Sequence, residues 1–351
     1  MIIKYSKIIL LCAALLCLCP FLDVAEAASI PDVPAQSYIV VDSDSGRIIG
    51  SRNPKEKLPI ASTTKILTTI LAIENIDDFE RKIEVPDSCV GVEGSSIYLK
   101  AKQRVSIKDL LYGTMLRSGN DAAETLAAYA GRNSDEGFVF MMNEKAAELG
   151  AYDSNFMNPH GLNDENHYST AYDLALISRH AMKNEMFKKI SSAEKYIAES
   201  MNTIFYNKNK VVYQYEYGNG IKIGYTKAAG RCLVASAEKD GTEIIVVVLN
   251  DNNWFQDSYK IFDWAFENYK SYSIVEAGQF AGRTPDGKPV FVSDSFSYLM
   301  TDEEKEKVRF ETKMTAPHIT SKDNKSVCGI YNIYMGDELI HTGGLALQAD
   351  N

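Results

Sequence analysis

The chain has 351 residues, a length that suits one large domain plus a smaller one, or two of middling size. Hydrophobic residues make up 45% of it and charged residues 24%, proportions that argue against a disordered or fibrous protein. The formal net charge of −10 argues against nucleic acid as a partner.

Residues 1–27 differ from the rest of the chain. Lys4 and Lys7 precede an apolar run, and Ala25-Glu26-Ala27 is typical of a signal-peptidase site. The run is short for a spanning helix of about 20 residues, so an uncleaved membrane anchor is the weaker alternative. We expect an exported protein, cut near Ala27-Ala28, that is secreted or associated with the cell wall or membrane surface.

The exported part contains three cysteines, Cys89, Cys232 and Cys328. An odd number at wide spacing does not build a disulfide scaffold, and whether any two of them pair stays open. Neither the cysteines nor the five histidines show metal-ligand spacing. We therefore expect no metal and no other cofactor.

The first half of the mature chain shows a hairpin followed by helices. Apolar, β-branched runs on both sides of a turn predict the hairpin over residues 37–51. A helical period of apolar residues predicts a helix over residues 62–75. Ser106, with Asp109 three residues later as in a capping box, predicts the start of another helix that ends at Ser118-Gly119.

Three more helices are predicted in the middle of the chain, over residues 120–130, 134–149 and 170–182. Each begins at a residue that can cap it, which is Asn120 for the first and Ser134 for the second. The predicted elements therefore change from strands to helices after residue 51.

The last third of the chain is rich in strands. Residues 233–237 and 244–248 are apolar runs around Lys239-Asp240-Gly241-Thr242, which is a strong hairpin signal, and an amphipathic helix follows over residues 254–269. Short β-like runs with turns between them follow from residue 271 onward. We predict an α+β fold, with one domain over residues 28–270 and a small all-β domain over residues 271–351.

The first candidate site is Ser62-Thr63-Thr64-Lys65. Residues three apart on a helix share a face, so the Lys65 amine can reach the Ser62 hydroxyl. A lysine can take the proton of a serine if burial or nearby cations lower its pKa. Taken alone the motif is weak, because a capping serine followed by a solvated lysine has the same spacing.

Two further motifs follow along the chain. Ser118-Gly119-Asn120 lies between two predicted helices, where a hydroxyl and an amide can relay a proton and hold a substrate amide. Lys222-Ile223-Gly224 opens the β-rich segment and precedes Tyr225 and Thr226, and there a lysine can offer its charge while glycine lets a substrate backbone approach. Ordinary loop and strand residues would account for each motif alone, Asn120 then being merely a helix cap.

The order and spacing of the three motifs carry more weight than any one of them. This layout is that of penicillin-binding proteins and β-lactamases, in which an antiparallel sheet packs against a helical cluster. More specifically, the chain resembles the D-alanyl-D-alanine carboxypeptidase family over nearly all of residues 30–350. The resemblance is carried by residues 60–65, 94–96, 116–122, 158–162 and 224–230.

The resemblance implies a role for each motif. The penultimate D-alanine carbonyl of a peptidoglycan stem peptide would acylate Ser62, with Lys65 as the base. Ser118 and Asn120 would complete the catalytic group. Lys222, Gly224, Tyr225 and Thr226 would bind the substrate, with the backbone N–H groups of Ser62 and Tyr225 as the oxyanion hole. β-Lactam antibiotics would be covalent inhibitors.

The chain departs from the family in two places. Ile223 stands where the family usually has threonine, and loss of a hydroxyl that binds the terminal carboxylate would remove about 1.5–3 kcal/mol, or tenfold or more in turnover or penicillin affinity. In addition, residues 341–351 offer no basic amphipathic helix of the kind that many relatives use as a membrane anchor.

Two alternative functions stay open. A catalytically weakened or non-catalytic protein that binds muropeptides would be consistent with Ile223. A β-lactamase is less consistent, because no Glu-x-x-Leu-Asn-like segment lies between the second and third motifs. Among the histidines, His160 is expected to be a loop residue held by local hydrogen bonds, and His167 and His180 have no evident role.

Overall fold

The computed structural model describes residues 29–131, 135–319 and 326–347. The predicted signal and the predicted cap Ser134 lie outside these residues. Within the described part of the chain, no helix is both long enough and apolar enough to cross a membrane.

The centre of the protein is a five-stranded antiparallel sheet with the strand order β2-β1-β9-β8-β7. Its strands are β1 (Ser37–Asp42), β2 (Ile48–Arg52), β7 (Gly218–Thr226), β8 (Gly230–Lys239) and β9 (Thr242–Leu249). Both predicted hairpins are therefore present, β1–β2 and β8–β9. The outermost strand on one side is β7, which was foreseen only at its Lys222 end.

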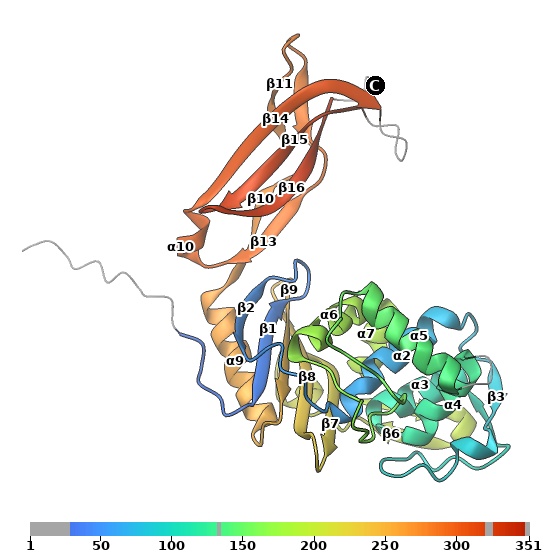
Figure 1. Ribbon diagram of the computed structural model, residues 1–351. Coiled ribbons are helices and arrows are strands. Elements are labelled where there is room, and N and C mark those ends of the chain that lie inside the picture. The colour runs from blue at the N-terminus through green and yellow to red at the C-terminus, as the bar shows by residue number, and fades with distance from the viewer. Residues whose placement is uncertain (1–28, 132–134, 320–325, 348–351) are drawn as a thin grey trace, which may run out of the picture.

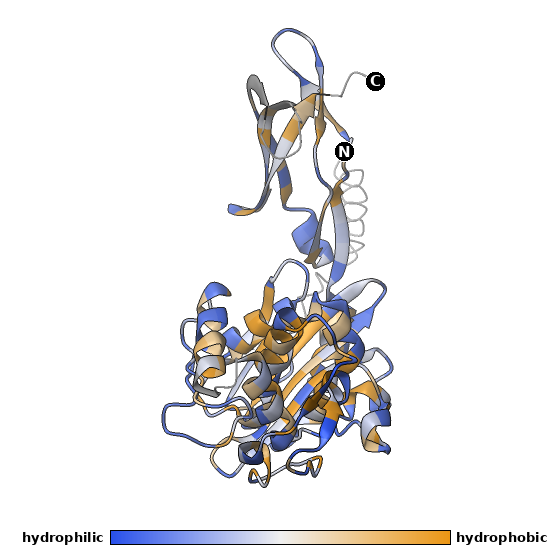
Figure 2. Cartoon of the chain, turned by 90° about the vertical axis from the view of Figure 1, so that its right-hand side faces the viewer, coloured by the Kyte–Doolittle hydropathy of each residue, from blue (hydrophilic) through white to orange (hydrophobic). Residues whose placement is uncertain are grey.

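Both faces of this sheet are buried, and its central strands are accordingly apolar at most positions. Alternate residues point to opposite faces, so Ile39 and Val41 of β1 pack into one hydrophobic cluster while Tyr38 and Val40 pack into the other. Figure 2 shows the hydrophobic colour concentrated on the sheet and on the sides of the helices that cover it. The sheet thus forms the middle layer of a three-layer body.

Helices form the two outer layers (Figure 1). One face is covered by α9 (Trp254–Asn268), and its side chains Phe255, Ile261, Phe262 and Trp264 complete one cluster. The other face is covered by α2 (Lys65–Asn75), α3 (Ile107–Leu116), α4 (Asn120–Ala130), α5 (Asp135–Glu148), α6 (Ala171–Met182) and α7 (Glu185–Ser191).

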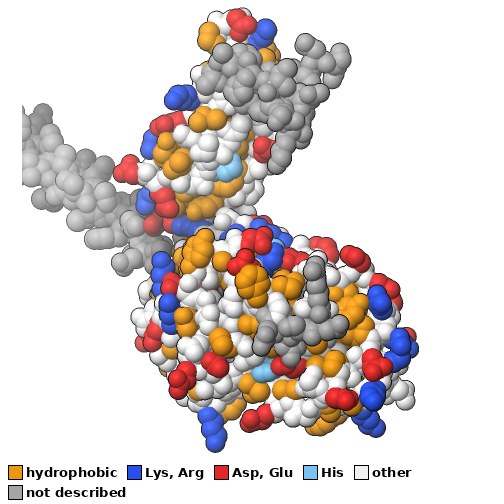
Figure 3. Space-filling model, turned by 45° about the vertical axis from the view of Figure 1, so that its right-hand side comes forward, with side chains coloured by type: hydrophobic (Ala, Val, Ile, Leu, Met, Phe, Trp, Pro, Cys, Tyr) orange, Lys and Arg blue, Asp and Glu red, His pale blue; other side chains and the backbone are white. Residues whose placement is uncertain are grey.

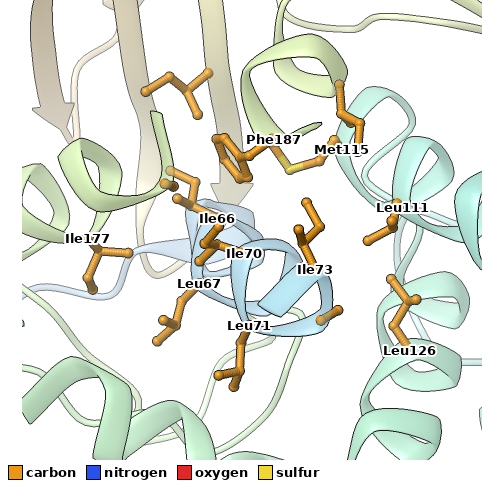
Figure 4. Close-up of a cluster of buried hydrophobic side chains, with 14 of the residues drawn as sticks. Ile66, Leu67, Ile70, Leu71, Ile73, Leu111, Met115, Leu126, Ile177 and Phe187 are labelled. Atoms are coloured by element: carbon orange, nitrogen blue, oxygen red, sulfur yellow. The ribbon is translucent and has the colours of Figure 1, made fainter. Parts of the chain in front are cut away.

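Helix α2 lies at the centre of the helical layer. Its residues Ile66, Leu67, Ile70 and Leu71 are almost completely buried, and the sticks in Figure 4 show them surrounded by side chains of α3, α4, α6 and α7. The helix is buried nearly all round, and most of its buried side chains are apolar, with Lys65, Thr68 and Thr69 as the polar exceptions. The position of the Ser62-to-Lys65 motif at its start is fixed by this packing.

Short elements complete the body. They are the strands β3 (Lys82–Glu84), β4 (Arg104–Ser106), β5 (Lys195–Ala198) and β6 (Thr203–Tyr206), the 3-10 turns η1 (Ala61–Thr64), η2 (Asp87–Cys89) and η3 (Glu199–Met201), and the helix α8 (Val211–Gln214). Strands β3 and β4 pair with each other, as do β5 and β6.

The predicted capping box at the start of α3 is only half formed. The Ser106 hydroxyl accepts the Asp109 backbone N–H at 3.1 Å, as expected. The Asp109 carboxylate instead accepts the Ser200 backbone N–H at 2.8 Å and the Tyr196 hydroxyl at 2.7 Å. A partner 91 residues away has displaced the local one.

The C-terminal part of the chain is all β apart from the single turn of α10 (Asp302–Lys305), and Figure 1 shows it standing away from the body beyond α9. A five-stranded sheet has the order β11-β12-β16-β15-β14, and β10 pairs with β13. These strands are β10 (Lys270–Val275), β11 (Phe280–Arg283), β12 (Pro289–Val292), β13 (Phe296–Met300), β14 (Val308–Ile319), β15 (Ser326–Met335) and β16 (Glu338–Leu347). The predicted α+β class with an all-β C-terminal part is confirmed.

One arginine joins the body to this C-terminal part. Arg47, in the β1–β2 turn, donates to the Leu299 carbonyl oxygen and forms an ion pair with Glu304. Its guanidinium also lies 5.6 Å from the ring centre of Tyr269 and 5.1 Å from that of Tyr298. We infer that two domains meet near residue 270, where α9 has ended and β10 begins.

Surface charge and cysteines add two observations. The face in Figure 3 carries acidic and basic side chains interspersed, with no large area of one sign. Cys89, Cys232 and Cys328 are buried thiols, at most 1% exposed.

Candidate active site

Ser62 lies in the tight turn η1 directly before α2, rather than inside the helix. The Thr63 hydroxyl donates to the Ile60 carbonyl oxygen at 2.7 Å and the Thr64 hydroxyl to the Ala61 carbonyl oxygen at 2.9 Å, and these bonds hold the turn. Ala61 has a φ of +47°, a left-handed conformation that costs an L-residue energy. Such strained residues gather at functional sites, where the surrounding structure holds them.

Lys65 is completely buried and lies beside the serine. Its Nζ atom is 3.0 Å from Ser62 Oγ, 2.7 Å from Asn120 Oδ1 and 2.7 Å from the His160 carbonyl oxygen. Burial lowers the pKa of Lys65 well below its usual value, and the charges of Lys222 and Lys208 lower it further. A lysine in this state can be a base at neutral pH.

The second motif meets the first at Asn120. Asn120 is the first residue of α4 and not its cap, which is Gly119, so the expectation of a capping asparagine is wrong. Its side-chain oxygen holds Lys65, while its side-chain N–H donates to the Glu93 carbonyl oxygen. Ser118, two residues earlier, is buried and has a φ of +61°.

A loop over residues 93–99 lies against this motif. The Asn120 backbone N–H donates to the Ser95 carbonyl oxygen at 2.7 Å. The Asp121 carboxylate accepts the backbone N–H groups of Ile97 and Leu99, both at 3.0 Å. Residues 120 and 121 therefore fix both Lys65 and the loop beside it.

The third motif lies on the edge strand β7, next to the serine turn. A Cβ atom added to Gly224 would lie 2.8 Å from the Ser62 backbone nitrogen, so only glycine lets the strand come this close. Lys222, two residues earlier on the same face, is 1% exposed. Burial lowers the pKa of Lys222 to about 7, and the charge of Lys208 adds to the effect.

The remaining predicted residues lie around this strand. Tyr225 is 63% exposed. The Thr226 hydroxyl accepts the Ala229 backbone N–H at 3.0 Å and so holds the turn between β7 and β8. The Ile223 side chain is partly buried against the cluster on the α9 side of the sheet. The structure thus places Lys65 in contact with Ser62 and Asn120, and Gly224 against the Ser62 backbone. The other predicted residues lie around this group.

Lys208 was missed by the sequence analysis, because a lysine in a loop gives no motif signal. It follows β6, and its ammonium donates to the Ser95 hydroxyl at 3.2 Å. Burial, followed by the charge of Arg117, lowers the pKa of Lys208. Its charge acts on both Lys65 and Lys222, so it adds positive potential to the site.

His160 has more than the local role that was expected. Its Nδ1 atom accepts the Leu162 backbone N–H at 3.1 Å, which is the local bond. Its Nε2 atom lies 2.8 Å from a carboxylate oxygen of Glu124, and its carbonyl oxygen holds Lys65. Glu124 and His160 therefore help to position the lysine, a contact that no local pattern could reveal.

The chemistry of this arrangement is nucleophilic. A serine with a buried amine at 3.0 Å can attack a carbonyl carbon. Strand β7 passes close to the serine turn at Gly224, so backbone N–H groups there can hold the oxyanion that forms. In the residues that the structure describes, no group of three or more His, Cys, Asp or Glu side chains is placed to hold a metal ion.

Comparison with known proteins agrees with this geometry. The family model for D-alanyl-D-alanine carboxypeptidase matches residues 24–253. The chain is 32% identical to D-alanyl-D-alanine carboxypeptidase DacF of Bacillus subtilis, over 90% of this chain and 82% of that protein. It is 34% identical to DacB2 of Mycobacterium tuberculosis, over 70% of this chain and 87% of that protein.

Solved structures show the same likeness. The crystal structure of penicillin binding protein 5 from Haemophilus influenzae superposes with a TM-score of 0.77 at 26% identity, covering 92% of this chain and 99% of that one. The similarity extends over the body and the C-terminal β part together.

Proposed function

The chain belongs to the D-alanyl-D-alanine carboxypeptidase family of serine peptidases, and on that basis we propose that it removes the terminal D-alanine from peptidoglycan stem pentapeptides through an acyl-enzyme on Ser62. The enzyme class, a hydrolase that is a carboxypeptidase, follows from the family. The observation that carries the mechanism is the buried Lys65 amine 3.0 Å from Ser62 Oγ.

The proposed reaction requires the neutral form of Lys65, and the contacts of the amine accommodate that form. A neutral amine has two N–H groups and one lone pair, whereas an ammonium has three N–H groups and no lone pair. The Asn120 and His160 oxygens, each at 2.7 Å, accept the two N–H groups. The lone pair is then left for the Ser62 proton, which is why the lowered pKa of Lys65 matters.

The proposed reaction has two halves. Ser62 Oγ bonds to the carbonyl carbon of the penultimate D-alanine while its proton passes to Lys65, and the backbone N–H groups of Ser62 and Tyr225 hold the resulting oxyanion. The C–N bond then breaks, and the leaving amine takes a proton that Lys65 supplies through Ser118. In the second half water attacks the ester and gives its proton to Lys65. The bond between the acyl carbon and Ser62 Oγ then breaks, Lys65 returns the proton to Ser62 Oγ, and the shortened peptide leaves.

Lys222 is proposed to bind the terminal carboxylate of the substrate. In the free enzyme its pKa of about 7 leaves it partly neutral near pH 7, because burial disfavours the charge. A bound carboxylate favours the charged form, so substrate binding raises this pKa. Gly224 and the backbone of Tyr225 would border the acyl group, and Thr226 would keep their strand in place.

The direct test is release of D-alanine from a muramyl pentapeptide, with a Ser62→Ala variant as the control. We expect turnover by the natural chain and none above background by the variant. A folded natural chain that binds the pentapeptide without releasing D-alanine would favour the non-catalytic alternative that Ile223 raised.

Covalent inhibition by β-lactams is a second proposed property. We expect intact-mass analysis after exposure to benzylpenicillin to show one adduct, and peptide mapping to place it on Ser62. Rapid steady hydrolysis of the β-lactam, in place of a long-lived adduct, would instead point to a β-lactamase.

Export is proposed because peptidoglycan lies outside the cytoplasmic membrane. The apolar run in residues 1–27 would act as the signal, and cleavage near Ala27-Ala28 would release the mature chain. The mass of the protein recovered from outside the membrane tests this, and a full-length mass would contradict it.

A further inference from the structure

A row of buried hydrogen bonds leads from His167 to the peptide bond before the nucleophile. The Met157 backbone N–H donates to His167 Nδ1 at 3.1 Å, and His167 Nε2 lies 2.9 Å from Thr64 Oγ1. The Thr64 hydroxyl in turn donates to the Ala61 carbonyl oxygen at 2.9 Å. His167 is 4% exposed and Thr64 is fully buried, so water does not replace these bonds.

The direction of each bond follows from its neighbours. Nδ1 of His167 is an acceptor, so the single proton of a neutral imidazole is on Nε2. Nε2–H therefore donates to the Thr64 oxygen, and the only proton of that hydroxyl goes to Ala61. Burial lowers the pKa of His167 to about 4, which agrees with a neutral ring at physiological pH.

The last bond acts on the nucleophile through one peptide plane. The Ala61 carbonyl and the Ser62 N–H belong to the same trans peptide, so they point in opposite directions. A hydrogen bond that holds the carbonyl oxygen thereby sets the direction of the N–H and also polarises it. Strand β7 passes next to the Ser62 N–H at Gly224, where an added Cβ atom would lie 2.8 Å from the Ser62 backbone nitrogen.

The Ala61–Ser62 peptide plane has to be stabilised by neighbouring residues, because the conformation of Ala61 is strained. Ala61 has a φ of +47°, and relaxation of that angle would turn the peptide plane. The segment that carries the histidine presses closely against it, since a Cβ on Gly161 would lie 1.9 Å from the Ala61 carbonyl oxygen. The same segment also holds Lys65 through the His160 carbonyl oxygen.

We propose that His167, acting through Thr64, is a positioning residue that aims the Ser62 N–H at the oxyanion of the reaction. The inference rests on the proposed function, because it assigns that N–H to the oxyanion hole. His167 touches neither the substrate nor the reacting atoms. It needs to stay neutral, so that one ring nitrogen accepts while the other donates.

The test compares substitutions that differ only in hydrogen bonding. His167→Leu keeps the approximate size and removes both ring nitrogens, whereas His167→Gln offers an amide with one acceptor and one donor. Complete loss of an oxyanion donor costs about 100-fold to 1,000-fold in kcat, so we expect partial misalignment in the leucine variant to cost about tenfold. KM should change less than about twofold, because the loss falls on the transition state.

The glutamine variant should recover most of the lost rate. Thr64→Val, which removes the hydroxyl at nearly constant size, should reproduce the effect of His167→Leu. The two changes act on one chain of bonds, so the double variant should lose about as much as one of them alone. The acylation rate by benzylpenicillin should follow kcat across the series, and His180→Gln at the surface should match the natural chain.

Several results would overturn the proposal. They are an unchanged kcat in folded His167→Leu, equal rates for the leucine and glutamine variants, or fully additive losses in the double variant. If the leucine variant does not fold, the comparison of Thr64→Val with Thr64→Ser decides, since serine keeps the hydroxyl. A natural chain that releases no D-alanine and takes up no penicillin defeats the proposed function itself, whereas an active chain with unaffected variants defeats only this inference.

Discussion

The body that carries Ser62 and the C-terminal β part differ in how their strands are covered. All six residues of β1 are buried, since helices cover both faces of the central sheet. In β16 of the C-terminal part, only Leu345 is buried among the residues described. The comparison indicates that the central sheet of the body is packed on both faces, so a substitution of given size should be felt more strongly there.

The largest expected effect comes from Lys65, the proposed base. Lys65→Met should lower acylation by benzylpenicillin by about 1,000-fold or more, because the Ser62 proton loses its acceptor. Lys270→Met is the matched change at the start of the C-terminal part, where the ammonium pairs with Asp302 at 3.1 Å and is 59% exposed. Stopped-flow acylation rates should be unchanged there, and a comparable loss at Lys270 would break the comparison.

The next effect separates packing from backbone strain. Gly161 and Gly278 have nearly the same φ, +86° and +82°, but a Cβ on Gly161 would lie 1.9 Å from a backbone oxygen whereas nothing lies within 4 Å of one on Gly278. Gly161→Ala should therefore cost about 3 kcal/mol or more of unfolding free energy and most of the activity.

Gly278→Ala should cost only about 1 kcal/mol, the strain of a left-handed alanine, and leave activity intact. Chemical denaturation and D-alanine release measure both variants. Equal losses in the two variants would mean that backbone strain, and not the close packing at Gly161, sets the cost.

The third effect is a pH dependence in the body. The pKa of His167 is about 4 in the folded protein and about 6.5 when unfolded, so the unfolded chain binds the extra proton between these values. The contribution of the neutral His167 to the unfolding free energy is fully present above pH 6.5 and is lost as the pH falls to about 4. The loss amounts to at most about 3 kcal/mol.

Unfolding free energies of the natural chain and His167→Gln should therefore converge as pH falls from 7 to 4. Asn184→Ala, which removes a helix cap and no group that titrates in this range, should keep a nearly constant offset. A constant offset for His167→Gln as well would contradict the buried neutral imidazole.

A smaller effect is expected where the two regions meet. Arg47→Ala removes an ion pair, a carbonyl bond and two ring contacts, and should cost about 1–3 kcal/mol at the junction. We expect faster proteolysis near residue 270 with unchanged D-alanine release. Arg52→Ala, whose partner Asp32 is largely exposed, should show neither change.

The smallest effect concerns Ile223. Lys222 and Gly224 share the face of β7 toward the serine turn, whereas Ile223 packs partly on the α9 side. A hydroxyl at this position could reach the substrate only by passing around the edge of β7. Ile223→Thr should therefore change kcat/KM by about fivefold at most, or about 1 kcal/mol. A gain of 100-fold would show that the isoleucine, despite its packing, suppresses catalysis.

The sequence was most informative where local chemistry decides the structure. The hairpins were predictable because β-branched runs flank short turns, as in residues 233–248. The three motifs were predictable because their spacing along the chain is distinctive. Ser62, Lys65 and Asn120 do meet, with Lys65 as the shared partner.

Long-range bonds limited the prediction. Asp109 bonds to Ser200 and not to the helix start, and Asn120 bonds to Lys65 and not to its own helix. Strand β7 was predicted only in part, because glycines at positions 218, 220 and 224 weaken the β pattern. His167 gave no signal, since its partner Thr64 lies 103 residues away.

The buried thiols have a consequence for a chain that is proposed to work outside the membrane. Oxidants there favour disulfides, and a chain cleaved as proposed would keep three cysteines, which cannot all pair within one molecule. Cys89, Cys232 and Cys328 are each no more than 1% exposed, so neither an oxidant nor a second copy can reach their sulfur atoms without unfolding. A cysteine introduced on the surface of the cleaved chain would therefore react with a dye or a spin label while Cys89, Cys232 and Cys328 stay protected.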